Sequence, residues 1–202
     1  MKNNLNSLLD SLAVYVSDYE ILNAEVSQSN IGWHIEHVLL TINGIVESLA
    51  HSNPKDFKPR FSVIKHIVLF TKKIPRGKAR VPKVVAPKVE YNEDSLRQHL
   101  EVTKENLKKL ELISNGHFFD HPYFGNLKKK QTIRFLEIHT YHHLKIIRDL
   151  TSVDLKEAKE FISSFPKAIL SSEIPLFEAF ELLFLKIDLE EDFAIDLSSD
   201  ES

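Results

Sequence analysis

The feature of this sequence that most limits its possible folds is the scarcity of chain-breaking residues. The 202-residue chain contains only 5 Gly and 8 Pro, and long stretches contain neither. Within those stretches apolar residues recur three and four positions apart, which is the spacing of one helix face. Turn-rich β structure needs more frequent Gly and Pro. The sequence therefore predicts an all-α protein, and a 43% apolar fraction is enough to build its core.

Five segments carry this helical pattern. They are residues 5–18, a segment from about 27 to 53, and residues 61–72, 93–114 and 129–151. Ser27 or Ser29 is expected to cap the second segment, and Asn92 or Asp94 the fourth. Side-chain oxygens at such positions accept hydrogen bonds from the free N–H groups of a first helical turn. The segment 117–126 between the last two helices is expected to be a loop.

The middle of the chain is basic. Between residues 57 and 89 there are ten Lys or Arg and no acid, and much of this charge lies in a predicted extended loop, residues 74–91. One interpretation is a solvated surface loop. The other is that Arg76, Lys78 and Arg80 attract a carboxylate or phosphate of a substrate. We expect no nucleic-acid partner, because aromatic residues do not alternate with the basic ones and the net charge is −3.

The composition changes after residue 152. We expect a helical bundle over residues 1–152 and a C-terminal extension over 153–189, with helices at 154–165 and 175–188 that pack on the bundle. An acidic tail, 190–202, is expected to be partly disordered. The apolar face of the extension could instead form a homodimer or partner contact.

Several classes of protein are excluded by what the chain lacks. There are no cysteines, so disulfides, thiolate zinc sites and cysteine nucleophiles are ruled out. The first residues have no apolar stretch typical of a signal peptide, and no run of 18 apolar residues exists. We therefore expect a cytoplasmic protein with no membrane partner.

The histidines offer the clearest candidate site. His139 and His143 are four positions apart in a helical segment, so their imidazoles share one face and could bind one divalent ion. A third ligand must come from another helix, and His37 is the best candidate, with His34 one turn away as its alternative. His142 points elsewhere on the helix, toward the surface or the surroundings of the ligands. The competing interpretation is that these are exposed or hydrogen-bonded core histidines without a metal.

Three motifs also resemble a known superfamily. They are Trp33-His34-Ile35-Glu36-His37-Val38-Leu39, His121-Pro122-Tyr123-Phe124-Gly125, and His139-Thr140-Tyr141-His142-His143-Leu144-Lys145-Ile146-Ile147. Together they are similar to motifs of the DinB-like/YfiT-like metalloenzymes, over residues 5–152. The resemblance implies a DinB-like four-helix bundle with His37, His139 and His143 as metal ligands. It implies zinc or nickel as the ion, and three-imidazole sites suit several divalent metals.

The same resemblance implies a function. Relatives in this superfamily act on small molecules, some by S-transfer that depends on a low-molecular-weight thiol. A metal on three imidazoles with an open position can activate a thiol or a water. We therefore expect a metal-dependent transferase or hydrolase. The alternative is a non-catalytic helical module for binding or assembly, whose histidines are structural.

Overall fold

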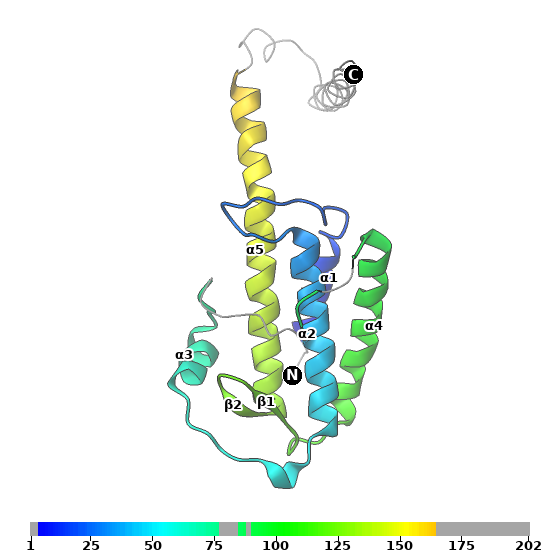
Figure 1. Cartoon of the computed structure of the whole chain (residues 1–202), viewed down its shortest axis with the longest axis vertical. Coiled ribbons are helices and arrows are strands. Elements are labelled where there is room, and N and C mark those ends of the chain that lie inside the picture. The colour runs from blue at the N-terminus through cyan, green and yellow to red at the C-terminus, as the bar shows by residue number, and fades with distance from the viewer. Residues whose placement is uncertain (1–3, 77–84, 88–89, 165–202) are drawn as a thin grey trace, which may run out of the picture. The chain divides into compact units, whose positions relative to one another are not determined.

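The computed structural model describes residues 4–76, 85–87 and 90–164, and within them the chain is mainly helical (Figure 1). Five α-helices, a short 3-10 helix and one two-stranded sheet follow one another along the chain. Their bounds are α1 Asn4–Ala13, α2 Ile31–His51, η1 Pro54–Asp56, α3 Val63–Thr71, α4 Glu93–Leu112, β1 Phe118–His121, β2 Gly125–Lys128 and α5 Lys129–Ser164. The helical character predicted from the sequence is confirmed, and the sheet is an addition to it.

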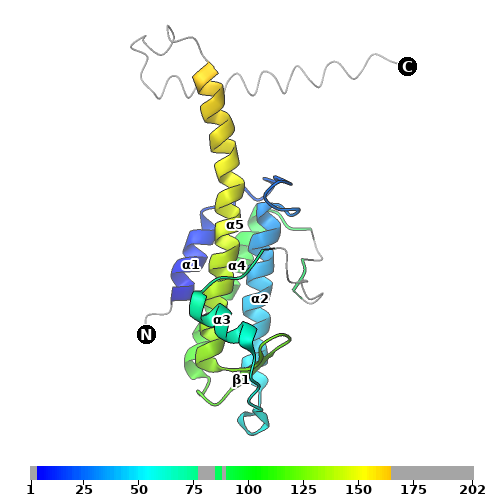
Figure 2. The same ribbon diagram turned by 90° about the vertical axis from the view of Figure 1, so that its left-hand side faces the viewer.

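The core lies between α1, α2, α4 and α5, which run alongside one another in both ribbon views (Figures 1 and 2). α2 supplies the largest share of it, with buried residues at helical spacing along its whole length. α2 packs against α4, and α1 packs against α4 beside it. Burying these apolar faces is the main source of stability for such an arrangement.

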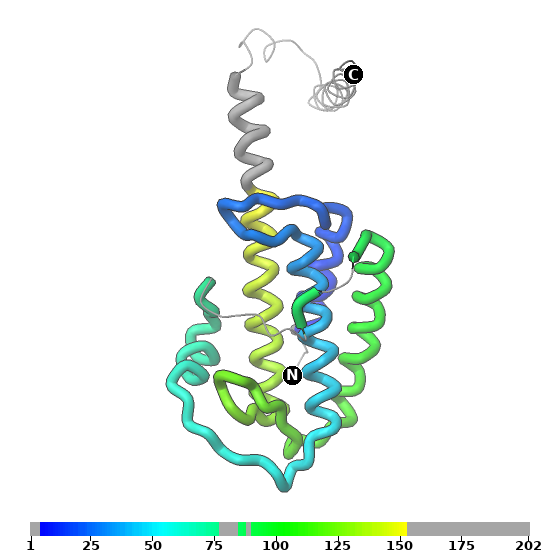
Figure 3. The backbone as a smooth tube through the Cα atoms, in the orientation of Figure 1, coloured from blue at the N-terminus to red at the C-terminus, as the bar shows by residue number. Residues whose placement is uncertain are grey.

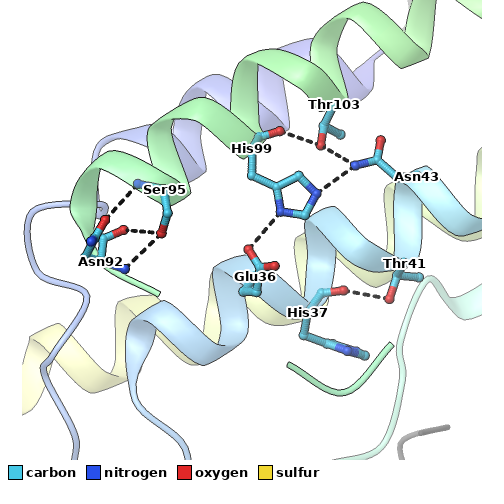
Figure 4. A network of polar contacts seen from close by, with 8 residues as sticks. All are labelled: Glu36, His37, Thr41, Asn43, Asn92, Ser95, His99 and Thr103. Atoms are coloured by element: carbon cyan, nitrogen blue, oxygen red, sulfur yellow. Dashed lines mark hydrogen bonds and ion pairs between the residues drawn. The ribbon is translucent and has the colours of Figure 1, made fainter. Parts of the chain in front are cut away.

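A polar network crosses the interface of α2 and α4 (Figure 4). The His99 ring donates from Nδ1 to Glu36 at 2.8 Å and accepts at Nε2 from the Asn43 amide at 2.8 Å. The same amide donates to Thr103, and Asn106 donates to Asn43. Each ring nitrogen therefore has a hydrogen-bond partner on α2, and the network joins the two helices through polar side chains.

The segment 117–126, predicted as a loop, instead contributes to a β-hairpin. β1 and β2 pair antiparallel, with Phe118 opposite Lys128 and His121 opposite Gly125. Gly125 has φ +68°, a conformation that glycine adopts without strain. The His121 Nδ1 accepts from the backbone N–H groups of Tyr123 and Phe124 and so closes the turn. The segment between α2 and α3 passes close to this hairpin in space (Figure 3). Ser62 of that segment donates to the carbonyl of Tyr123 in the turn.

The last helix is longer than predicted. α5 begins at Lys129, as expected, but continues to Ser164 without a break at residue 152, so the separate helix predicted for 154–165 is wrong. No Gly or Pro lies between residues 126 and 165 to end it. The chain divides into two compact units, residues 1–155 and 156–202. The predicted helix at 175–188 and the tail at 190–202 lie outside the described residues.

The helix caps differ in part from the prediction. Asn30 caps α2 by accepting from the Trp33 N–H at 2.9 Å, so neither Ser27 nor Ser29 does. Asn92 caps α4, as predicted, in a reciprocal capping box with Ser95. No helix among the described residues is long and apolar enough to cross a membrane.

Candidate metal centre

The structure brings His37 of α2 together with His139 and His143 of α5. Each of the three rings offers one nitrogen, and these nitrogens all lie within 4.8 Å of one another. The ring centroids are 4.6–5.1 Å apart. The spacing predicted from the sequence is therefore confirmed as a spatial cluster, and a single ion could reach all three nitrogens after small side-chain adjustments.

His37 is held by contacts on two sides. Its ring stacks on Trp33, with centroids 5.0 Å apart and an interplanar angle of 15°. Its Nδ1 donates to the Val85 carbonyl at 2.7 Å. Because a carbonyl can only accept, the proton lies on Nδ1 and the Nε2 lone pair is left free, which is the tautomer that a metal ligand needs.

His143 is oriented by a second histidine. Its Nδ1 lies 3.0 Å from Nδ1 of His34, whose Nε2 lies 2.9 Å from the Ser27 hydroxyl. If His143 binds a metal through Nε2, its Nδ1 must carry the proton and donate to His34. His34 then accepts at Nδ1 and donates from Nε2 to Ser27. Each nitrogen in this series of hydrogen bonds from His143 to Ser27 is therefore either a donor or an acceptor, without conflict.

His139 supplies the test of whether these residues fit a metal. Its Nδ1 is buried and has no hydrogen-bond partner among the described residues. A buried polar atom without a partner is rare and costly. An arrangement of three imidazoles with one unpartnered ring nitrogen therefore fits a site for a cation better than a packed core.

Burial keeps these imidazoles neutral. Desolvation lowers the pKa of His37, an effect that the hydrogen bond to Val85 partly offsets. Desolvation, reinforced by the neighbouring imidazoles, lowers the pKa of both His139 and His143 well below the usual value. The same causes lower the pKa of His34 to about 4. Neutral rings at pH 7 leave lone pairs for a metal, which competes with protons for these nitrogens.

The cluster lies in the wall of a large cavity. The cavity has a volume of about 1560 Å³ and is bounded by residues of α2, α3, α5 and the hairpin. All three clustered histidines contribute to its lining, so a bound ion would face open space. An open coordination position is a feature of catalytic rather than structural metal sites.

A comparison with models of protein families shows to which family the chain belongs. Residues 6–150 match the model described as a protein of unknown function, DUF1569. The chain belongs to the DUF1569 family. No curated protein matches it, and no solved structure does. The match covers α2 and the part of α5 that carries His139 and His143.

The other candidate site residues of this DUF1569 protein lie in different places. His34 lies outside the three-histidine group and contacts His143 instead. His142 is half-buried and lines the cavity, and desolvation followed by the charge of Arg76 lowers its pKa to about 4. Arg76 also lines the cavity and pairs with Asp149 at 2.5 Å. Lys78 and Arg80 lie outside the described residues.

Sequence reasoning missed Ser27, Val85 and Trp33 as supports of the DUF1569 site. Val85 acts through its backbone carbonyl, which no residue type reveals. The sequence offers Ser27, with Ser29, as a cap of α2, whereas the Ser27 hydroxyl accepts from the Ser29 N–H and contacts His34. Trp33 precedes His37 by one helical turn, and this spacing could have indicated a stacked pair.

Proposed function

We propose that this DUF1569 protein is a metal-dependent enzyme that acts on a small molecule at His37, His139 and His143. The observation that carries the proposal is the convergence of three neutral imidazoles on one point in the wall of an open cavity. Closed structural sites surround their metal with four protein ligands, and the described residues place no fourth metal-binding side chain in this group.

We further propose kinship with the DinB-like superfamily, in which α1, α2, α4 and α5 would be the four helices of the bundle. Two features support it. One ligand histidine lies on the second long helix of the chain and two lie four residues apart on the last, as the resemblance implies. The family match over residues 6–150 also spans nearly the same region as that resemblance.

The residues of the chain would bind and orient the reactants. A divalent ion, zinc or nickel, would supply Lewis-acid activation of a thiol or a water. Val85 and His34 fix the orientations of the ligand rings His37 and His143 through the hydrogen bonds described above. We propose thiol-dependent S-transfer or hydrolysis as the reaction class.

Metal analysis of the purified full-length protein tests the ligand set. We expect about one equivalent of zinc or nickel in the wild type and at least a tenfold loss of affinity in His143→Ala, because one of three ligands is removed. His51→Ala is the matched control, since His51 is an exposed histidine on α2. Equal metal content in the wild type and His143→Ala would contradict the proposal.

Cobalt substitution separates the two reaction classes. If a thiol is the activated group, adding a low-molecular-weight thiol to the Co²⁺-loaded protein should produce a thiolate-to-cobalt charge-transfer band. The band should be absent when the corresponding alcohol is added. A spectrum that does not change with thiol would disfavour S-transfer and leave hydrolysis as the proposed reaction.

A further inference from the structure

One wall of the cavity is an unusually exposed apolar helix face. Ile64, Ile67, Val68 and Thr71 of α3 all line the cavity, at the three- and four-residue spacing of one face. Ile64 and Ile67 are 57% and 54% exposed. Apolar side chains this exposed on a concave surface are typical of a site that binds an apolar ligand.

The opposite walls are apolar as well. The hairpin and the start of α5 contribute the aromatic rings of Phe119, Tyr123, Phe124 and Phe135, and α2 contributes Leu40 and Ile45. The volume of about 1560 Å³ exceeds the roughly 300–1,000 Å³ of ordinary small-molecule pockets. A small polar substrate would leave most of this surface in contact with water.

The charged side chains of the lining favour an anionic ligand at the histidines. Three neutral imidazoles do not offset the charge of a divalent ion. Lys73 adds a positive side chain to the same lining, whereas the charge of Arg76 is paired with Asp149. Among the described lining residues Asp120 is the only carboxylate, and it lies exposed on β1. Glu36, next to His37 in sequence, is directed to His99 instead (Figure 4). An anion is therefore the ligand that would balance the charge at this site.

We infer that the ligand of this cavity is an anionic amphiphile. Its single negatively charged group would bind at the metal position, and its apolar body would lie against α3 and the aromatic residues of the hairpin. This inference rests on the proposed function, because the ion supplies most of the positive charge. It adds the chemical class of the substrate, which the ligand set alone does not determine.

Calorimetric titration of the zinc-loaded, full-length protein tests the inference with three probes. Decanoate has both the anionic group and the apolar body, acetate lacks the body, and decanol lacks the charge. We expect decanoate, kept below its micelle concentration, to bind at least 100-fold more tightly than acetate and at least tenfold more tightly than decanol. Trp33, the single Trp of the chain, lines the cavity, so its fluorescence should change as decanoate binds.

A pair of variants places the binding at α3. Ile67→Asn should weaken decanoate binding about tenfold, because a polar amide replaces an apolar contact, and Ile64→Asn should do the same. Val102→Asn is the control, since Val102 is 48% exposed on α4 and does not line the cavity. All three positions are exposed, so the variants should fold, which circular dichroism would verify.

The outcomes separate this inference from the proposed function. Retained zinc with weakened decanoate binding in Ile67→Asn and Ile64→Asn alone would support it. Retained zinc with decanoate binding no tighter than decanol, or equally weakened in Val102→Asn, would overturn it and leave the proposed function intact. A wild-type protein that binds no zinc would overturn both.

Discussion

At the scale of single residues, the candidate site depends on which nitrogen of each imidazole carries its proton. Val85 fixes this for His37, and if His143 binds the metal through Nε2, its Nδ1 carries the proton and donates to His34. Partners of this kind orient the ring and raise its basicity as a ligand. The residues around the ligands should therefore influence metal affinity almost as much as the ligands do.

The His34→Ala variant tests this dependence. It removes the acceptor of the His143 Nδ1–H and leaves all three candidate ligands in place, so we expect zinc affinity to fall by roughly 10–100-fold. Competition with a chelator of known affinity measures the change. Ser27→Ala, one step further along the same contacts, should have a smaller effect, and His51→Ala none. Unchanged affinity in His34→Ala would show that the hydrogen bond between the histidines does not position the ligand.

Helical spacing singles out His139 and His143 in the sequence, whereas His34 and His37 are both candidates for the third position until the family resemblance favours His37. The roles of the neighbouring residues could not be predicted in this way. His34 and His37 lie on the same helix three positions apart. Only the position of α5 decides that His37 approaches both His139 and His143, whereas His34 contacts the other side of His143 through Nδ1. Spacing along one helix does not specify its rotation relative to another.

At the scale of elements, the start of α2 is fixed by close packing around Gly32. A Cβ atom at this position would overlap the ring of Tyr91 and lie 3.1 Å from the Tyr19 carbonyl oxygen. The Tyr91 ring cannot easily move, because its hydroxyl donates to the Asn30 cap at 2.6 Å. The absence of a side chain at Gly32 thus lets the first turn of α2, which leads into His34 and His37, pack closely against Tyr19 and Tyr91.

Two glycine substitutions on this helix should have opposite effects. We expect Gly32→Ala to lower the free energy of unfolding by about 1–3 kcal/mol through overpacking. Gly44→Ala should raise it by about 0.5–1 kcal/mol, because no atom lies within 4 Å of the new methyl group and alanine favours the helix. Urea denaturation of both variants measures the difference. Stabilisation by Gly32→Ala would contradict the packing described for this turn.

The elements were predictable where periodicity was strong and not where it was weak. The apolar face of α2 is buried as predicted, and so is most of that of α1, although α1 ends at Ala13 and not near residue 18. On α4, the apolar Val102 is 48% exposed, and the polar Thr103 occupies the buried position. The position of a residue on the helix, and not its polarity, therefore determines which side chain is buried here. The Asn43 amide donates a hydrogen bond to the buried Thr103 hydroxyl. The hairpin was missed because strands of four residues are too short to show a clear alternation.

At the scale of the whole molecule, burial of several histidines links stability to pH. The pKa of His34, His121 and His142 is lowered to about 4, in each case chiefly by desolvation. In the unfolded chain these groups titrate near pH 6.5. Between these values the unfolded state binds protons that the folded state does not, so the free energy of unfolding must decrease as the pH falls from about 6.5 to 4.

Urea denaturation between pH 7 and pH 4 measures this decrease. His121→Asn should reduce the slope, because an amide oxygen can replace Nδ1 as acceptor in the turn without titrating in this range. His51→Gln, which alters an exposed histidine, should leave the slope unchanged. A free energy of unfolding that stays constant over this range would contradict the burial of neutral imidazoles.

The cavity is the feature that no local pattern could indicate. Its lining combines residues of α2, α3, α5 and the hairpin, and Ile64 and Ile67 have the same apolar character as core residues. A sequence does not distinguish an apolar face that packs from one that borders empty space. The helical class of the chain follows from the scarcity of Gly and Pro, whereas its substrate class depends on how the helices are arranged.

The central claim is that His37, His139 and His143 bind one metal ion that keeps a position open to the cavity. Zinc K-edge X-ray absorption of the loaded, full-length protein tests it most directly. We predict three imidazole nitrogens at about 2.0–2.1 Å and at least one further light-atom ligand that exchanges when decanoate is added. A zinc shell with four protein ligands that decanoate leaves unchanged, or one without imidazole, would contradict the claim.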